Sequence, residues 1–202
     1  MKEGIYMKKL LALATAFLLT PFSTLAISLA DIRNNPDQYV LVTRESNYNI
    51  YVDSYSIASL RYDPPYFAMS GKVYIVIYNM DAILKSTATT TYDGHRSLKH
   101  LFLEERKTHP STSANDLYIL ALDDMQKNSG LTFHCGPADV WNLDGNYQGS
   151  MTSDQMNSLT TNAKTNELSC ELASSAYQIA NYFFYKGYNL YFGPKFDSEN
   201  LY

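Results

Sequence analysis

Residues 66–78 read YFAMSGKVYIVIY, and two kinds of side chain alternate along this stretch. Apolar side chains hold most of the odd positions, whereas aromatic or polar side chains hold most of the even ones. Successive side chains of a β-strand point to opposite faces of its sheet, so a repeat of two residues predicts a strand with one face in a core. We take this segment as the central strand and expect the rest of the chain to cover its aliphatic face.

Shorter strands are predicted before and after this segment. They lie at 39–43, 50–52, 83–92, 117–122, 131–135 and 140–143. Residues 98–107 fit either a helix or an edge strand, and we favour the strand. The polar residues 148–168 are expected to form a connector. Consecutive strands joined by short turns, such as the one signalled by Asp93-Gly94, are typical of an antiparallel meander.

One clear amphipathic helix is predicted over residues 169–186. Apolar side chains recur at helical spacing and form a spine, while a polar arc lies opposite. The spine is Ala173, Tyr177, Ala180 and Phe184, and the arc is Glu171, Ser174, Gln178 and Asn181. Gly187 stands where a left-handed helix cap belongs, and residues 188–192 fit a final short strand. The predicted fold class is α+β, an antiparallel β-sheet meander with a C-terminal amphipathic helix packed on one face.

The N-terminus has the pattern of a secretory signal peptide. Two lysines precede an apolar run over residues 10–19, which is too short to span a bilayer, and small residues that suit cleavage follow. We expect a signal peptide at 1–26, with cleavage after residue 26 or 30, and a single α+β domain at 31–195. Residues 196–202 are expected to be a flexible tail or a tag remnant. The mature chain is expected to be secreted, periplasmic or on the cell surface, without a membrane span.

The charge balance argues against nucleic acid as a partner. The chain of 202 residues has a formal net charge of −4, and removing residues 1–26 changes it to about −6, because that segment has three lysines and one glutamate. An acidic chain without a basic stripe lacks the electrostatic footprint of a nucleic-acid-binding protein.

Two cysteines in an exported chain permit one disulfide. Cys135 is predicted on the core face of a late strand, and Cys170 at the start of the helix that covers this face. We expect a bridge between Cys135 and Cys170, and the alternative is two free thiols. A catalytic Cys135 with His134 as its base is disfavoured, because neighbours on a strand point to opposite faces.

The sequence has no nucleophile elbow, phosphate loop or paired-cysteine metal site. His100 and Glu104 could present metal ligands near His95 if their segment were helical, but we favour a solvated polar face, because such spacing is common by chance. The Asp144 loop lacks the remaining ligands of a calcium loop. We therefore expect no metal, no cofactor and no catalytic residue.

Three segments resemble the surface-adhesin protein E family of small exported bacterial proteins. They are Ile50-Tyr51-Val52-Asp53 followed by Ser56-Ile57, the strand from Lys72 to Tyr78, and Ser175-Ala176-Tyr177-Gln178-Ile179-Ala180-Asn181. The resemblance implies an antiparallel sheet with a C-terminal helix, sometimes joined by a disulfide, and often a dimer. It also implies adhesion to host extracellular proteins. The chain differs from that family in lacking a lipid-anchor cysteine.

The even positions of the central strand suggest a binding surface. Tyr66, Lys72, Tyr74 and Tyr78 share the face away from the predicted helix, and Tyr51 joins them from a neighbouring strand. Tyrosine is enriched at interfaces, although it is also a good strand former that packs against cross-strand neighbours. We expect a non-catalytic binding or adhesion module that uses this face or a sheet edge, with a host extracellular protein or a second copy as partner. The alternatives are a cell-envelope hydrolase and a structural, self-associating envelope protein.

Overall fold

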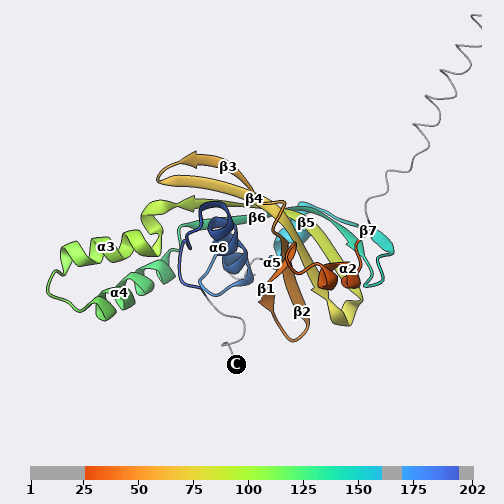
Figure 1. Ribbon diagram of the computed structural model, residues 1–202, viewed down its shortest axis with the longest axis horizontal. Coiled ribbons are helices and arrows are strands. Elements are labelled where there is room, and N and C mark those ends of the chain that lie inside the picture. The colour runs from red at the N-terminus through yellow and green to blue at the C-terminus, as the bar shows by residue number, and fades with distance from the viewer. Residues whose placement is uncertain (1–25, 161–169, 196–202) are drawn as a thin grey trace, which may run out of the picture.

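The computed structural model describes residues 26–160 and 170–195 (Figure 1). The predicted signal peptide and C-terminal tail lie almost wholly outside this part of the chain. The strands are β1 Tyr39–Arg44, β2 Tyr48–Asp53, β3 Ala58–Asp63, β4 Tyr66–Ile77, β5 Ala82–Asp93, β6 Leu131–Trp141 and β7 Tyr147–Met151. The helices are α2 Leu29–Asn34, α3 Leu98–Thr108, α4 Ala114–Lys127, α5 Ser153–Thr160 and α6 Ser175–Tyr188, with short 3-10 turns at Tyr78–Met80 and Gly94–Arg96.

The fold is α+β, as predicted, with one antiparallel sheet of seven described strands. Six of them follow the order β1-β2-β4-β5-β6-β7, and the seventh, β3, pairs with β4. The segment at 66–78 does form the central strand. On one side β4 pairs with β5 along its whole length. On the other side its first half pairs with β3 and its second half with β2. Strands that follow each other in the chain pair with each other, except β2 and β3, which both pair with β4, so the sheet is largely a meander.

The aliphatic face of β4 is sealed by α6, which lies beside the sheet in Figure 1. Met69 and Val73 from the odd positions of β4 join Ala180 and Phe183 of α6 in the main core. A Cβ atom at Gly71 would lie 2.8 Å from Cζ of Phe183, so the glycine lets this ring rest on the strand backbone. The predicted packing of the C-terminal helix on the sheet is confirmed.

The predicted limits of this helix were wrong at both ends. It begins at Ser175, where Ser174 is the N-cap and its side chain accepts a hydrogen bond from the backbone N–H of Tyr177. The left-handed cap is Asn189, with φ 54°, and Gly187 is helical. The glycine leaves room for the end of the Met69 side chain, which a Cβ at this position would displace.

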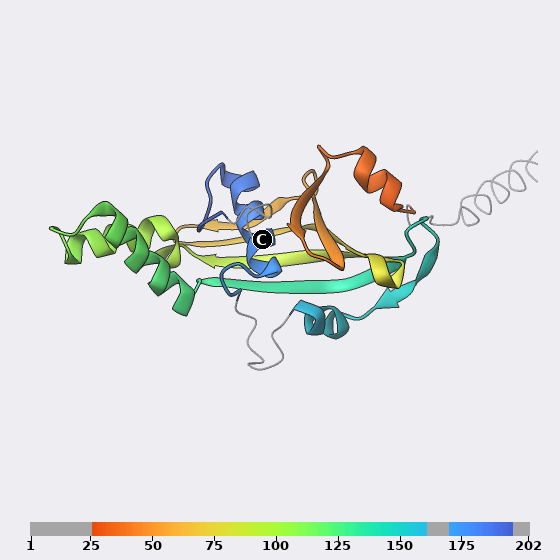
Figure 2. The same ribbon diagram turned by 90° about the horizontal axis from the view of Figure 1, so that it is seen from below.

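Two segments predicted as strands are helices. Residues 98–107 form α3 and residues 117–122 lie within α4, each capped at its N-terminus by a serine side chain, Ser97 and Ser113. The run at 117–122 is apolar at every position, so its sequence shows no contrast with the period of a helix. Together α3 and α4 form a hairpin that extends beyond one end of the sheet (Figure 2).

The predicted connector at 148–168 contains two elements, β7 and α5, and residues 161–168 of it lie outside the described residues. The side chain of Met156 in α5 is buried in the main core. Residues 188–192 do not form a strand; they return over α6, where Phe192 is buried.

Candidate binding surface

The predicted tyrosine face exists, but a helix covers half of it. Tyr74 and Tyr51 are only 3% and 8% exposed, and they form a second buried cluster with Ile32 of α2. Within this cluster the rings of Tyr39 and Tyr74 meet edge to face at 5.2 Å. Burial raises the pKa of the Tyr74 hydroxyl well above its ordinary value. Tyr51 and Tyr74 therefore belong to a core and are closed to any partner.

Tyr78 lies at the edge of the same cluster. Its hydroxyl accepts a hydrogen bond from Asn49 Nδ2 at 2.8 Å, and the Arg33 guanidinium of α2 lies 6.0 Å from its ring centre. The helix that makes these contacts is held by a capping box, in which the side chain of Ser28 and that of Asp31 each accept from the other's backbone N–H.

Tyr66 and Lys72 remain exposed on the open half of the face. The Tyr66 side chain is 45% exposed, with the Arg61 guanidinium 5.5 Å from its ring centre. The five predicted binding residues are thus divided between a buried cluster and an open surface, and they do not form one patch.

The most accessible strand is β3, in which all six residues are exposed. It forms the outer rim of the sheet in Figure 1 and pairs only with β4 among the described strands. Leu60 and Tyr62 are 59% and 68% exposed, and Tyr55 just before the strand is also exposed. Side-chain contacts hold β3 in place on the face of the sheet that packs against α6. There the ring of Tyr62 contacts those of Phe67 and Tyr188.

The hydrogen bonds at the start of β4 show which way its backbone groups point. Residues of an antiparallel pair alternate between exchanging hydrogen bonds and turning their backbone groups away from each other. The Gly94 N–H donates to the Pro65 oxygen at 2.6 Å, and the Asp93 N–H donates to the Gly130 oxygen at 2.8 Å. The pair Tyr66 and Asp93 is therefore of the second kind, and Tyr66 directs its backbone groups toward β3.

The same alternation decides which groups of β3 face outward. Asp63 pairs with Tyr66, so its backbone groups point inward. Tyr62, one residue earlier and paired with Phe67, turns its N–H and C=O toward the open edge. A β-bulge at Leu60 adds one unpaired residue to this edge. An exposed row of backbone donors and acceptors is a template for pairing with another chain.

The edge of β6 beyond the end of β7 is not open in the way the β3 edge is, because a side chain hydrogen-bonds to its backbone. The Cys135 N–H donates to Asn157 Oδ1 at 2.8 Å, and Asn157 Nδ2 donates to the Cys135 oxygen at 3.1 Å. The amide of Asn157 in α5 therefore takes the place of a neighbouring strand at this point.

The predicted disulfide is absent, and Cys135 and Cys170 are buried free thiols. The Cys170 N–H donates to the oxygen of Leu131, four residues from Cys135 along β6. Four residues of a strand span about 13 Å, which is beyond the reach of a disulfide. Burial raises the pKa of Cys135 to about 11 and that of Cys170 to about 12, so neither is an activated nucleophile. His134 is exposed on the opposite face from Cys135, as predicted.

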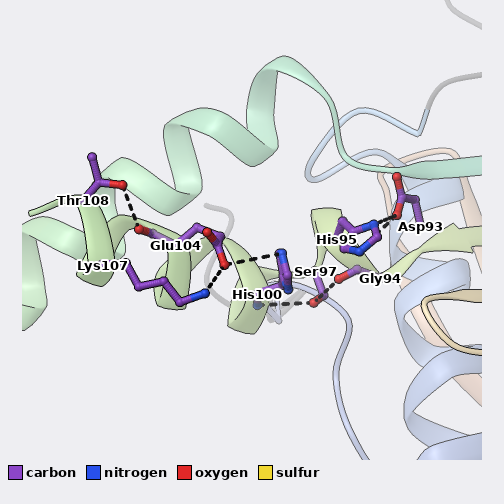
Figure 3. A network of polar contacts seen from close by, with 8 residues as sticks. All are labelled: Asp93, Gly94, His95, Ser97, His100, Glu104, Lys107 and Thr108. Atoms are coloured by element: carbon purple, nitrogen blue, oxygen red, sulfur yellow. Dashed lines mark hydrogen bonds and ion pairs between the residues drawn. The ribbon is translucent and has the colours of Figure 1, made fainter.

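The histidine cluster considered as a metal site forms a surface network (Figure 3). His95 Nδ1 lies 3.4 Å from Asp93 Oδ1, and His100 Nε2 lies 3.9 Å from Glu104 Oε1. Lys107 Nζ contacts the same Glu104 oxygen at 2.6 Å, and its hydrogen bond lowers the pKa of Glu104. Within residues 26–160 and 170–195, no three His, Cys, Asp or Glu side chains are arranged to hold a metal ion.

A cavity of about 500 Å³ lies between the sheet and the N-terminal end of α6. Its walls are mostly aliphatic, with Ile50, Val73 and Ile179 among them, and Glu45 is its one carboxylate. A hydrolase cleft needs converging acid and base groups. This cavity brings no such pair together, so it does not favour the enzyme alternative.

No family model, no curated protein and no solved structure matches this chain. In the part of the chain that the structure covers, no helix is long and apolar enough to cross a membrane.

Proposed function

We propose that this protein is an exported, non-catalytic binding module that receives an extended segment of a partner along β3. The observation that carries the proposal is the exposure of all six β3 residues beside an edge that no other described strand pairs with. In β-strand addition, main-chain hydrogen bonds supply affinity and alternate side chains supply specificity. The expected signal peptide and the resemblance to protein E adhesins support export and adhesion to a host extracellular protein.

The sequence of β3 also suits a second copy of the same chain. In an antiparallel pair centred on Tyr62, the outward N–H and C=O of Tyr62 meet those of its own counterpart. Arg61 in each copy then lies opposite Asp63 in the other, on the same face of the joined sheet. Opposite charges directly across an antiparallel pair stabilise it, whereas like charges destabilise it. A register centred on Arg61 would instead oppose two arginines.

Charge reversal tests this register. In Arg61→Asp both charged positions of the strand are negative, and in Asp63→Arg both are positive, so each variant alone should be monomeric. An equimolar mixture should form a heterodimer, because every cross-chain pair is then attractive. The intrachain Arg61–Asp63 ion pair, with its 2.6 Å distance, cannot explain such a rescue, since it is lost in both variants. Light scattering gives the mass, and native mass spectrometry distinguishes the heterodimer.

Arg44→Asp is the matched control, because this exposed arginine lies on β1, which pairs with β2 and not with β3. It should leave the mass of the wild-type dimer unchanged. A wild-type chain that stays monomeric at millimolar concentration would exclude self-pairing. Failure of the mixture to associate would exclude the Tyr62-centred register.

A further inference from the structure

A hollow of about 630 Å³ lies on the open half of the sheet face away from α6. Its walls come from β3, β4, β5, β6 and the loop after α4. The lining includes Arg61, Tyr66, Ala68, Thr91, Asn128 and Thr132.

The register of four strands explains why the surface is hollow here. Arg61, Ala68, Thr91 and Thr132 pair in sequence across the sheet and form one row. Ala68 is the smallest member of this row, so the surface dips between longer side chains. Tyr66 is two residues from Ala68 on the same face of β4, and its exposed ring forms one wall.

The groups around the hollow nearly balance in charge. Arg61 is paired with Asp63 at 2.6 Å, and Asp93 accepts a hydrogen bond from the His95 N–H at 3.0 Å. The hollow therefore presents no large excess of one charge to attract a strongly ionic ligand. A strongly apolar ligand is equally disfavoured, because the polar rim would lose hydrogen bonds with water.

Neutral hydrogen-bonding groups fill the remaining rim. The hydroxyls of Thr91 and Thr132 hydrogen-bond to each other, and each retains further capacity to donate or accept. The side chain of Asn128 is held in its loop by the Gly130 N–H, which donates to Asn128 Oδ1 at 2.9 Å. The hollow therefore offers an aromatic wall, an alanine floor and several donors and acceptors without net charge.

We infer that this hollow binds a ring of a neutral saccharide. Such a ring has an apolar C–H face that suits Tyr66 and a rim of hydroxyls that both donate and accept. Arg61 lines the hollow and also takes part in the proposed pairing of β3, so binding is best tested at β4 residues, which lie outside that pairing.

An array of immobilised neutral and acidic glycans is the first test, and it includes monosaccharides and oligosaccharides so that a free sugar is distinguished from a glycan chain. The best neutral ligand is then titrated by NMR. Ala68→Ile fills the floor without removing a polar group and should weaken binding about tenfold or more. Tyr66→Ala should do the same by removing the aromatic wall.

Thr87→Val is the matched control, because Thr87 is exposed on the same face of β5 but pairs with Lys72, outside the hollow. It should bind as the wild type does. Circular dichroism and light scattering on each variant separate loss of binding from loss of fold or of β3 pairing. The inference is overturned if no neutral glycan binds, if only acidic glycans bind, or if folded Ala68→Ile binds with unchanged affinity.

Discussion

Asn181 shows at the scale of one residue where a helical pattern misleads. Its spacing places it in a polar arc opposite the spine of α6, yet it is buried. Its Oδ1 accepts from the N–H groups of Phe192 and Gly193 at 2.9 and 3.1 Å, and its Nδ2 donates to the Pro194 oxygen at 3.0 Å. A sequence pattern reports the helix but not the later segment that folds back on it.

We expect Asn181→Ala to lower the free energy of unfolding by about 3 kcal/mol, because two buried N–H groups lose their acceptor. Urea unfolding measures this change. Hydrogen exchange at Phe192 and Gly193 should become faster in the variant. Gln178→Ala, one turn earlier, is the control and should cost much less, since the Gln178 amide makes one hydrogen bond to the Ala173 oxygen. Equal losses in the two variants would contradict this role of Asn181.

The tyrosines of the sheet show that alternation predicts the face on which a side chain lies but not whether that side chain is exposed. A repeat of two residues correctly assigned Tyr74 and Lys72 to one face of β4. It could not reveal that Tyr74 is buried and Lys72 exposed, because the difference comes from α2, a six-residue helix far away in sequence. The aromatic character of Tyr51 and Tyr74 fits a buried cluster as well as an open surface.

At the scale of elements, the strands were predicted better than the helices. The alternating segment at 66–78 became β4, since alternation directly reflects a sheet with one covered face. The segment at 83–92, rich in β-branched threonines, became β5. In α4, Leu117, Ala121 and Met125 are buried at a spacing of four, but Tyr118, Ile119 and Leu120 between them are exposed apolar residues. Because these exposed residues are apolar, the sequence shows no difference between an apolar and a polar face, on which a helical assignment depends. The exposed edge of β3 gave no signal, because its sequence was too short and mixed to classify.

The helix α2 supports a specific prediction. Ile32 is fully buried against the tyrosine cluster, so Ile32→Ala should lower the free energy of unfolding by about 2–4 kcal/mol. Asn34→Ala, exposed on the same helix, should change it little. Urea denaturation of both variants gives the comparison. A small loss in Ile32→Ala would mean that α2 does not seal the second cluster.

At the scale of the whole molecule, the buried thiols predict how stability changes with pH. Both folded pKa values, about 11 and about 12, lie above the ordinary value of 9.0. Below pH 9 the thiols are protonated in both states, and their contribution is fully present. As the pH rises above 9, the unfolded chain loses these protons first, so the free energy of unfolding falls until the folded pKa values are passed.

The expected slope is about 1.4 kcal/mol per pH unit for each thiol in this range, with tyrosines adding to it above pH 10. Urea unfolding at pH 8, 9 and 10 under reducing conditions measures it. The double variant Cys135→Ala/Cys170→Ala should show a smaller slope than the wild type. The same slope in both proteins would show that the thiols do not govern alkaline instability.

The position of β3 also limits how large an assembly could grow. A pair centred on Tyr62 is related to itself by a two-fold axis, and both copies use the same three residues, Arg61 to Asp63. A third chain would find that strand occupied on each side, so polymerisation stops at its first step. An adhesin built in this way would present two copies of every other surface, and multivalent attachment would follow without fibre formation.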